Sequence, residues 1–451
     1  MGRKRGNQRR LEIVHPDCAG IDIGKRRVYV AVGPERSEES VRNFGTFTDE
    51  YEALAQWLDE CQVRIVAMES TGVYWIALYE LLERRGFEVH LVNPRATKQV
   101  SGRKSDVLDC EWLWQLMSYG LLKGAFRPPD EVCVLRIYAR ERARLVRDVS
   151  RSVQHIQKAL TQMNVQLDTV LSDIMGTTGQ RIVRAIVDGE RDGAVLARHR
   201  DRRVKADQAT IARSLRGNWR EEHLFSLSQA LERYDFLQAQ LHRCEQRIGS
   251  TLQTLDGAHE LAEQPLAVPA RNAGERTLQL ALRQVLGVDL TAIPTIGVET
   301  ALVLASEIGP DLSRFPNCEH FCSWLTLAPG TPISGDKNLG GPPQRRVNRA
   351  GQALRVAAST ARTSQSFIGA SHRARLARLD TPRAIKATAH QLARLIYAML
   401  TRGEDYVERG MAAFEAEREG RRLRALQRKA HQLGFQLVQT DPELTNEKSV
   451  A

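Results

Sequence analysis

The sequence predicts an α/β domain, a long coiled-coil insertion and an all-α C-terminal domain, in that order. Residues 17–128 alternate β-branched segments with helical ones, the pattern of strands and helices packed in layers. Apolar residues in 129–258 recur three and four positions apart, as in coiled coils. Residues 286–403 are helical in pattern and rich in arginine. The remaining ranges are a basic disordered arm at 1–16, a linker at 259–285 and a charged helical tail at 404–451.

The α/β domain is expected to begin with a β-hairpin and to continue with alternating helices and strands. A tight Gly-Lys turn joins the first two strands, and a buried central strand ends at Glu69. The next strand stops at the turn signal Asn93-Pro94. The expected strands cover 19–23, 26–32, 63–68 and 87–92, and the expected helices cover 49–61 and 74–85.

Four carboxylates indicate the chemistry. Asp22 and Glu69 lie on strands that can be neighbours, while Asp106 and Asp109 are three residues apart on the next helix and share one face. Carboxylates gathered at one point repel each other unless cations neutralise them. Two hard divalent ions about 4 Å apart are a common arrangement for displacement at phosphate. The sequence therefore predicts a cage for two Mg²⁺ ions.

Other interpretations of these acids exist. An Asp on a strand after Gly-Ile is also the first phosphate motif of actin-like and sugar kinases, and Asp106 with Asp109 is compatible with a solvated helix face. A kinase of that type needs a second glycine-rich phosphate loop, and none follows in this sequence. The ordered series of strand Asp, strand-end Glu and helical Asp-x-x-Asp favours the metal cage.

These residues resemble the insertion-sequence transposases with an Asp-Glu-Asp-Asp nuclease domain, the one-ten family, which are known as bridge-RNA-guided recombinases. The resemblance runs from about residue 17 to about residue 400 and implies an RNase H-like (RuvC-like) fold for the first domain. Its motifs are Gly-Ile-Asp-Ile-Gly-Lys (20–25), Met-Glu-Ser-Thr-Gly-Val-Tyr-Trp (68–75), Val-Asn-Pro (92–94), Lys-Ser-Asp-Val-Leu-Asp (104–109), Pro-Thr-Ile-Gly (294–297) and Ser-Gly-Asp-Lys (334–337).

The resemblance also implies a serine nucleophile, and Ser334 matches it. Ser334 lies in a loop rich in Gly and Pro at 328–343. A lone loop serine is more often structural than catalytic, and the sequence places no His or Lys as its base, although Lys337 is near. The implied reaction forms a covalent phosphoserine, with Ser334 and the four carboxylates in a composite active site.

The charge balance points to a polyanion. The chain has 65 basic and 54 acidic residues, a net charge of +11. Residues 341–400 hold eleven Arg or Lys and a single acid, Asp380, whereas a solvated helical surface normally mixes both signs. The resemblance implies donor and target DNA and a structured guide RNA as partners. The candidate nucleic-acid-binding residues are Gly297, Lys337, Arg345, Arg346, Arg349 and Arg355.

Gly297 enters this set because residues 290–308 resemble a helix-hairpin-helix. In that motif a glycine-bearing turn presents backbone N–H groups to a phosphate. A plain helix-turn-helix core fits the same segment equally well. Gly297 is expected to mark a tight turn in either case.

Two apolar stripes predict the coiled-coil arms, and residues 172–220 between them predict a small helical tip. The stripes are compatible with an antiparallel hairpin inside one chain and with a stalk that joins two or four chains. The resemblance favours a homo-oligomer, because strand exchange needs several active subunits. The stripes are Val146, Val149, Val153, Ile156, Leu160, Met163 and Leu167, and then Tyr234, Leu237, Leu241, Cys244 and Ile248.

The seven cysteines are scattered without a Cys-x-x-Cys pair, so neither zinc nor a disulfide framework is expected. Cys318 and Cys322 are expected to be small core residues. The basic arm lacks the apolar core of a signal peptide, and no apolar stretch is long enough for a membrane span. The expected location is the bacterial cytoplasm, in association with the nucleoid.

The sequence thus predicts a recombinase of a mobile element, and two other classes remain open. A junction-resolving endonuclease would use the same carboxylates with water as the nucleophile. A domesticated nucleic-acid-binding protein would keep the acids without turnover. The tail after residue 404 receives no function.

Overall fold

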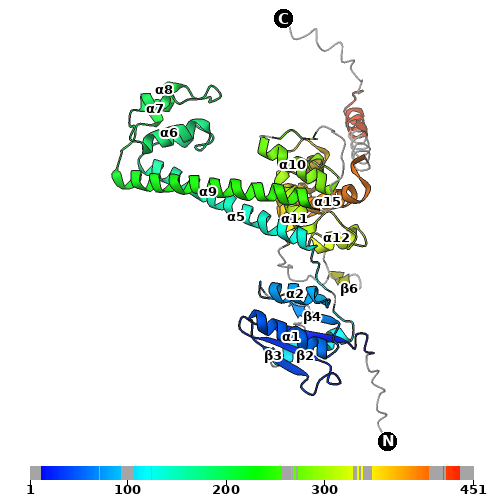
Figure 1. The fold of residues 1–451 in the computed structure, drawn as a ribbon. Coiled ribbons are helices and arrows are strands. Elements are labelled where there is room, and N and C mark those ends of the chain that lie inside the picture. The colour runs from blue at the N-terminus through cyan, green and yellow to red at the C-terminus, as the bar shows by residue number, and fades with distance from the viewer. Residues whose placement is uncertain are drawn as a thin grey trace. The chain divides into compact units, whose positions relative to one another are not determined.

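The structure is a computed structural model, and it divides into two compact units, Met1–Arg127 and Pro128–Ala451. Each unit is described by itself (Figure 1). The structure describes residues 12–70, 72–92, 106–122, 124–255, 266, 268–270, 273–328, 333–334, 337–338, 348–405, 420 and 423–436.

The first unit is built on a five-stranded mixed sheet in the order β3-β2-β1-β4-β5. β1 pairs antiparallel with β2 and parallel with β4, which pairs parallel with β5. These four strands confirm the predicted hairpin and the predicted central strand. β3 was not predicted. The strands are β1 (Cys18–Ile23), β2 (Val28–Val32), β3 (Val41–Phe44), β4 (Ile65–Glu69) and β5 (Glu88–Val92).

Helices cover both faces of this sheet. α1 (Thr48–Glu60) and α2 (Trp75–Arg84) confirm two predicted helices, and they share a core with alternate residues of β1, among them Ile21. The other residues of the strand, such as Cys18, face α4 (Asp106–Ser118). Because successive side chains of a strand point to opposite faces, the two cores together fix the direction of every residue of β1 and β4.

The second unit begins with a helical arm. α5 (Asp130–Gln162) and α9 (Glu221–Thr254) lie side by side (Figure 1). Near the start of α5, the backbone oxygen of Tyr138 accepts a hydrogen bond from Cys244 Sγ, near the end of α9, at 3.4 Å. The end of α5 packs with the start of α9 in one core. The two helices are therefore antiparallel.

This pairing forms an antiparallel hairpin inside one chain, which is one of the two arrangements compatible with the sequence. Ile156 and Leu160 are fully buried in its seam, as the stripe predicted. Val146 is 37% exposed, so the stripe does not lie in the seam along its whole length. Leu135 and Ala139 are buried three heptads before Ile156 and Leu160, so the ends of α5 share one phase, whereas in the middle of the helix the buried residue Leu145 lies one position before Val146.

The tip between the arms is helical, as predicted. It contains η1 (Leu167–Thr169), α6 (Thr177–Val187), α7 (Gly193–Ala197) and α8 (Gln208–Ser214). Ile182 of α6 and Ile211 of α8 have no exposed surface and join the core at the end of the arm.

The C-terminal domain is a cluster of helices with one small hairpin. α10 lies within the range predicted as a linker, where Leu282 and Val285 are buried at helical spacing, so this half of the range belongs to the domain. The hairpin β6–β7 also corrects the all-α prediction. The elements are α10 (Ala273–Leu286), η2 (Leu290–Ala292), α11 (Val298–Ile308), α12 (Cys318–Trp324), β6 (Ile333–Ser334), β7 (Lys337–Asn338), α13 (Arg349–Thr360), α14 (Phe367–Leu376) and α15 (Thr381–Arg402).

Three smaller expectations also fall on this domain and the tail. Cys322 is buried in α12, with its sulfur 4.0 Å from that of the half-buried Cys318, and burial raises the pKa of the Cys322 thiol to about 12. Residues 423–432 are helical, within the helical part of the predicted tail. Among the described residues, no helix combines the length and the apolar character that crossing a bilayer requires.

Candidate active site

Asp22 and Glu69 occupy matching positions on neighbouring strands. The parallel register of β1 and β4 includes the pair Ile21 and Met68, and each acid follows by one residue. Ile21 and Met68 both lie in the core under α1 and α2. Because side chains alternate, Asp22 and Glu69 are both directed to the opposite face, which α4 covers. Both acids are half-buried.

α4 runs antiparallel to β1. Near its C-terminal end, the Trp114 carbonyl accepts a hydrogen bond from Cys18 Sγ at 3.7 Å. Further along, the Ser118 carbonyl accepts from the backbone N–H of Val14 at 2.8 Å, just before the strand begins. The N-terminal turn of α4 therefore lies toward Asp22, at the edge where the strand ends.

Gly20 lets α4 lie directly on the strand. A Cβ atom added at Gly20 would be 2.2 Å from the backbone nitrogen of Trp114 and 2.3 Å from the carbonyl oxygen of Cys110. Backbone atoms cannot move aside as a flexible side chain can, so only glycine fits here. Sequence reasoning quoted this glycine as part of a motif and missed its role. Its position two residues before Asp22, inside a strand, is the usual signal of a close backbone approach.

The pKa of the Cys110 thiol reflects the acids near it. Burial raises the pKa of Cys110 to about 12, and the charges of Glu111 and Asp22 add to the rise. Asp22 is thus close enough to the first half of α4 for its charge to act there. Asp109 is the half-buried neighbour of Cys110 in the chain. The positive end of the α4 dipole lies at the same edge and favours negative charge there.

The structure therefore brings Asp22 and Glu69 to one edge and one face of the sheet, the face that is covered by α4, which carries Asp109 and begins at Asp106. The side chain of Asp106 lies outside the described part of the chain. Among the described residues, no group of three or more His, Cys, Asp or Glu has a metal-binding arrangement. The Mg²⁺ cage therefore stays a prediction. The oxygen donors suit it, because Mg²⁺ prefers carboxylates and water.

Ser70, directly after Glu69, fastens the end of β4 to β5. Its backbone N–H and its hydroxyl both donate to the carbonyl of Val92, at 3.0 and 3.1 Å. Gly72 then turns the chain with φ of +60°, and its carbonyl accepts a hydrogen bond from the indole of Trp75 at 3.2 Å. Ser70 and Gly72 thus hold the chain that follows Glu69, a role that their residue types alone did not reveal.

Ser334 lies in the second unit, in the two-stranded hairpin. The register pairs Ser334 of β6 with Lys337 of β7. The side chains of both residues lie outside the described part. The predicted proximity of Lys337 to Ser334 is therefore confirmed for the backbone, and the catalytic role of either residue is a separate question.

The candidate phosphate-binding residues differ in their surroundings. Gly297 is the N-cap of α11 with φ of −98°, and the left-handed turn residue is Thr295 at +75°, so the tight turn precedes Gly297. Arg349 is exposed at the start of α13. Arg355 is half-buried and donates to the backbone and side-chain oxygens of Thr326, at 3.0 and 3.2 Å. Arg345 and Arg346 lie outside the described residues.

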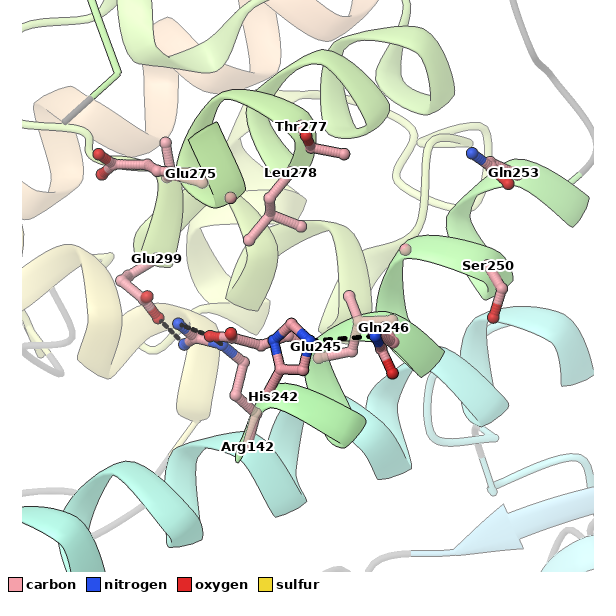
Figure 2. A pocket seen from close by; sticks show the side chains of 14 residues that line it. Arg142, His242, Glu245, Gln246, Ser250, Gln253, Glu275, Thr277, Leu278 and Glu299 are labelled. Atoms are coloured by element: carbon pink, nitrogen blue, oxygen red, sulfur yellow. Dashed lines mark hydrogen bonds and ion pairs between the residues drawn. The ribbon is translucent and has the colours of Figure 1, made fainter. Parts of the chain in front are cut away.

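A cleft of about 660 Å³ lies at the root of the arm, where α9, α10 and α11 meet. In Figure 2, Arg142 reaches toward Glu245 and Glu299. Arg142 Nε donates to Glu245 at 3.0 Å, and its Nη1 donates to Glu299. One guanidinium thus joins α5 to α9 and α11, which indicates a structural role for this polar cleft.

Comparison with known proteins now bears on this geometry. A family model described as "Transposase", of the Asp-Glu-Asp-Asp IS110 type, matches residues 19–165, and a model described as "Transposase IS116/IS110/IS902 family" matches residues 289–372. A comparison with curated proteins found no match. The fold and these matches define the class as a transposase, an enzyme that moves DNA. More specifically, the chain carries the transposase domains of the IS110 family of insertion sequences.

Proposed function

We propose that this protein is a recombinase that cuts and rejoins the DNA of its insertion sequence at a metal-dependent site with a serine nucleophile. The carboxylates Asp22, Glu69, Asp106 and Asp109 would hold two Mg²⁺ ions, and Ser334 would be the nucleophile. The observation that carries the metal site is the matched position of Asp22 and Glu69 under the N-terminal turn of α4.

The acids of the first unit are suited to hold cations at a reacting phosphate. Bound Mg²⁺ would polarise the phosphate and stabilise the charge that develops on its oxygens. The pairing of the two strands that carry Asp22 and Glu69 sets the spacing of these acids, and Gly20 sets the distance of α4 from β1. This arrangement uses rigid elements, as a precise catalytic site requires.

The proposed reaction has two balanced steps. The Ser334 oxygen bonds to phosphorus and gives up its proton, while the bond from phosphorus to the 3′ oxygen breaks and that oxygen takes up a proton. A 3′ hydroxyl of another strand then attacks the phosphoserine, which reseals DNA and restores the serine. The cations of the basic segment 341–400 support this proposal, because they offset phosphate charge.

Cleavage by carboxylate variants tests the metal site. We expect Asp22→Asn or Asp106→Asn to abolish strand cleavage in Mg²⁺ while DNA binding stays near wild type. Asp59→Asn is the matched control, since Asp59 is an exposed acid of α1. Normal cleavage by either site variant would remove the cage from the mechanism.

The covalent intermediate tests the nucleophile. Ser334→Ala should eliminate a protein–DNA adduct that survives denaturant, whereas Ser359→Ala, at an exposed serine of α13, should retain it. If the Ser334 variant still nicks DNA and the wild type forms no adduct, water is the nucleophile and the protein is an endonuclease. If the wild type neither nicks nor forms an adduct in Mg²⁺, the domesticated, non-catalytic interpretation holds.

A structured guide RNA is the proposed source of sequence specificity. The support is the net charge of +11 together with the family resemblance, since base pairing would read sequence while the protein contacts phosphates. Protein expressed with its flanking element DNA should co-purify with one discrete RNA. Site-specific recombination by protein stripped of RNA would contradict the guided mechanism and leave the carboxylate and serine assignments intact.

We also propose that the protein acts as a dimer or tetramer. Because Ile156 is buried in the seam within one chain, a charge there would disrupt the arm whether or not it joins two chains. Val146 is the better probe, since it is apolar and exposed. Val146→Glu should lower the mass measured by light scattering with nucleic acid present, and an unchanged mass would exclude this face from the interface.

A further inference from the structure

A groove on the distal half of the arm has the composition of a nucleic-acid-binding surface. It lies between α5 and α9 and has a volume of about 290 Å³. Its floor contains the small buried residues Ser152, Ala159 and Ala230. Its rim is exposed and carries His155, Lys158, Gln162, Phe225, Ser226, Gln229 and Arg233.

Two other cations, one on α5 and one on α6, are held in ion pairs, unlike those of the groove. Arg151 pairs with Asp148 at 3.1 Å, and Arg184 pairs with Asp235 at 2.6 Å. Lys158 and Arg233 belong to none of the ion pairs found among the described residues, and no acid lines the groove. Two exposed positive charges beside a depression without acids attract an anion.

The aromatic ring of Phe225 at the rim indicates which kind of anion the groove binds. Phe225 is 68% exposed and lines the groove. An exposed ring beside cations and amide groups offers a flat face for stacking and donors for phosphate oxygens. This combination is how proteins bind unpaired strands, where bases stack on aromatic rings and cations follow the backbone. A fully paired duplex keeps its bases stacked inside and would leave the ring unused.

We propose that this distal groove binds a single-stranded stretch of nucleic acid, with a base on Phe225 and phosphates at Lys158 and Arg233. This inference rests on the proposed function, in which the protein handles both DNA and RNA, and it adds a contact site far in sequence from Ser334 and the carboxylates. The α9 side of the groove lies outside both family matches.

Binding of a labelled oligonucleotide tests the stacking contact. The probes are fluorescein-labelled oligo(U) and oligo(dT) of about 15 nucleotides, within the length that such surfaces bind. They are measured by anisotropy with full-length protein freed of nucleic acid, in EDTA. Phe225→Ala should raise the Kd about tenfold, the loss of one stacked base. Phe236→Ala is the control, since Phe236 is 61% exposed on the same helix and does not line the groove.

The salt dependence tests the two cations. Lys158→Gln with Arg233→Gln should lower the slope of log affinity against log salt by about 0.7 for each lost phosphate contact. Arg151→Gln with Arg184→Gln removes the same charge at paired residues of α5 and α6 that do not line the groove, and should leave the slope near wild type. Equal slopes for the two double variants, or equal affinity for the two Phe variants, would overturn the proposal.

Crosslinking locates the strand independently of these variants. An oligonucleotide with 5-iodouracil, irradiated on the wild type, should attach to the peptide that contains Phe225. Crosslinks confined to residues 341–400 would reject the groove. Stronger binding of oligo(U) or of oligo(dT) tells whether RNA or DNA occupies it, and either supports the site. The binding assay contains EDTA and does not depend on Ser334. A negative binding result therefore rejects the groove without bearing on the proposed reaction, and a negative cleavage result leaves the binding unaffected.

Discussion

Two helices of this protein are held against distant elements in opposite ways. α4 lies on β1 through Gly20, whose missing side chain brings the two backbones together, and through buried apolar residues such as Leu113. α11 lies on α5 through charges. Arg140 donates two hydrogen bonds to Glu307, both at 2.9 Å, and Arg136 donates to the Glu307 carbonyl at 2.9 Å.

The two regions differ in the structural role of their acidic residues. Glu307 is 8% exposed, and two arginines neutralise it, so this acid is part of the structure. Around Gly20 apolar contacts hold the helix, and Asp22 and Asp109 lie beyond them, half-buried at the edge. The following predictions test this contrast, from the largest expected effect to the smallest.

Gly20→Ala is expected to have the largest effect. The added methyl group overlaps backbone atoms of α4, so the helix must shift, at a cost of about 3 kcal/mol in the free energy of unfolding. The shift also moves Asp109 relative to Asp22, so cleavage should fall in the folded fraction. Urea unfolding and a cleavage assay measure the two effects.

Gly249→Ala is the matched control for that change. Gly249 lies inside α9, and an added Cβ would meet nothing within 4 Å. Because alanine favours the helix more than glycine does, the same substitution should stabilise here by up to about 1 kcal/mol. Destabilisation at both glycines would mean that the close approach of α4 is not the cause.

Glu307→Ala should lower the free energy of unfolding by about 2 kcal/mol, because it leaves two arginines without their acid. This value lies below that of a fully buried pair, since the Arg140 side chain is 44% exposed and water can solvate it. Glu299→Ala, at an exposed acid of the same helix, should cost less. Equal losses for the two variants would contradict a special role for Glu307.

His372 should make stability depend on pH. Burial lowers its pKa, and the charges of Arg375, Arg362 and Arg373 lower it further. The native state thus binds this proton more weakly than the unfolded state does. Stability from this group is complete above the unfolded pKa of about 6.5 and is lost as pH falls below it, toward the folded pKa, by at most about 1.4 kcal/mol per pH unit.

Urea unfolding at several pH values measures this slope. Within the folded protein, His372 Nδ1 lies 2.9 Å from Thr388 Oγ1, in a network with Arg375. His372→Gln should reduce the acid loss of stability relative to wild type, because the amide does not titrate. An unchanged slope in this variant would assign the acid sensitivity to other groups.

Asp235→Asn is expected to have the smallest effect. Its ion pair with Arg184 is bidentate, with distances of 2.6 and 2.7 Å, but both side chains are more than 40% exposed. Exposed pairs are worth about 1 kcal/mol or less, because water screens them. Thermal unfolding at low and high salt should show a small loss that salt reduces. A loss as large as that of Glu307→Ala would remove the distinction between buried and exposed pairs.

Local patterns in the sequence predicted most elements of the first unit and the two long helices of the second. β-branched runs located β1, β2, β4 and β5, and apolar spacing located the arm. The sequence pattern did not predict β3, because Val41–Phe44 is a four-residue edge strand with no buried residue. The sequence pattern did not predict α10, because the prolines and glycines around its start indicated a linker. The burial of its apolar face depends on contacts with other helices.

The candidate site was predictable in its residue types and in part of its arrangement. The strand patterns around Asp22 and Glu69 were enough to expect the two acids on strands that can be neighbours, because strand patterns are local. The approach of α4 to Gly20 depends on the packing of segments about ninety residues apart, and Arg140 meets Glu307 across 167 residues. Contacts at such separations leave no periodic signal in a single sequence.

The antiparallel course of the arm has a consequence for how this protein can vary. Because α9 returns beside α5, the chain comes back to the root of the arm, where Arg142 of α5 pairs with Glu245 of α9. Removing equal numbers of heptads from the distal parts of both helices would therefore shorten the arm without changing its root. Arm length can then evolve, or be engineered, independently of the helices that pack at its root.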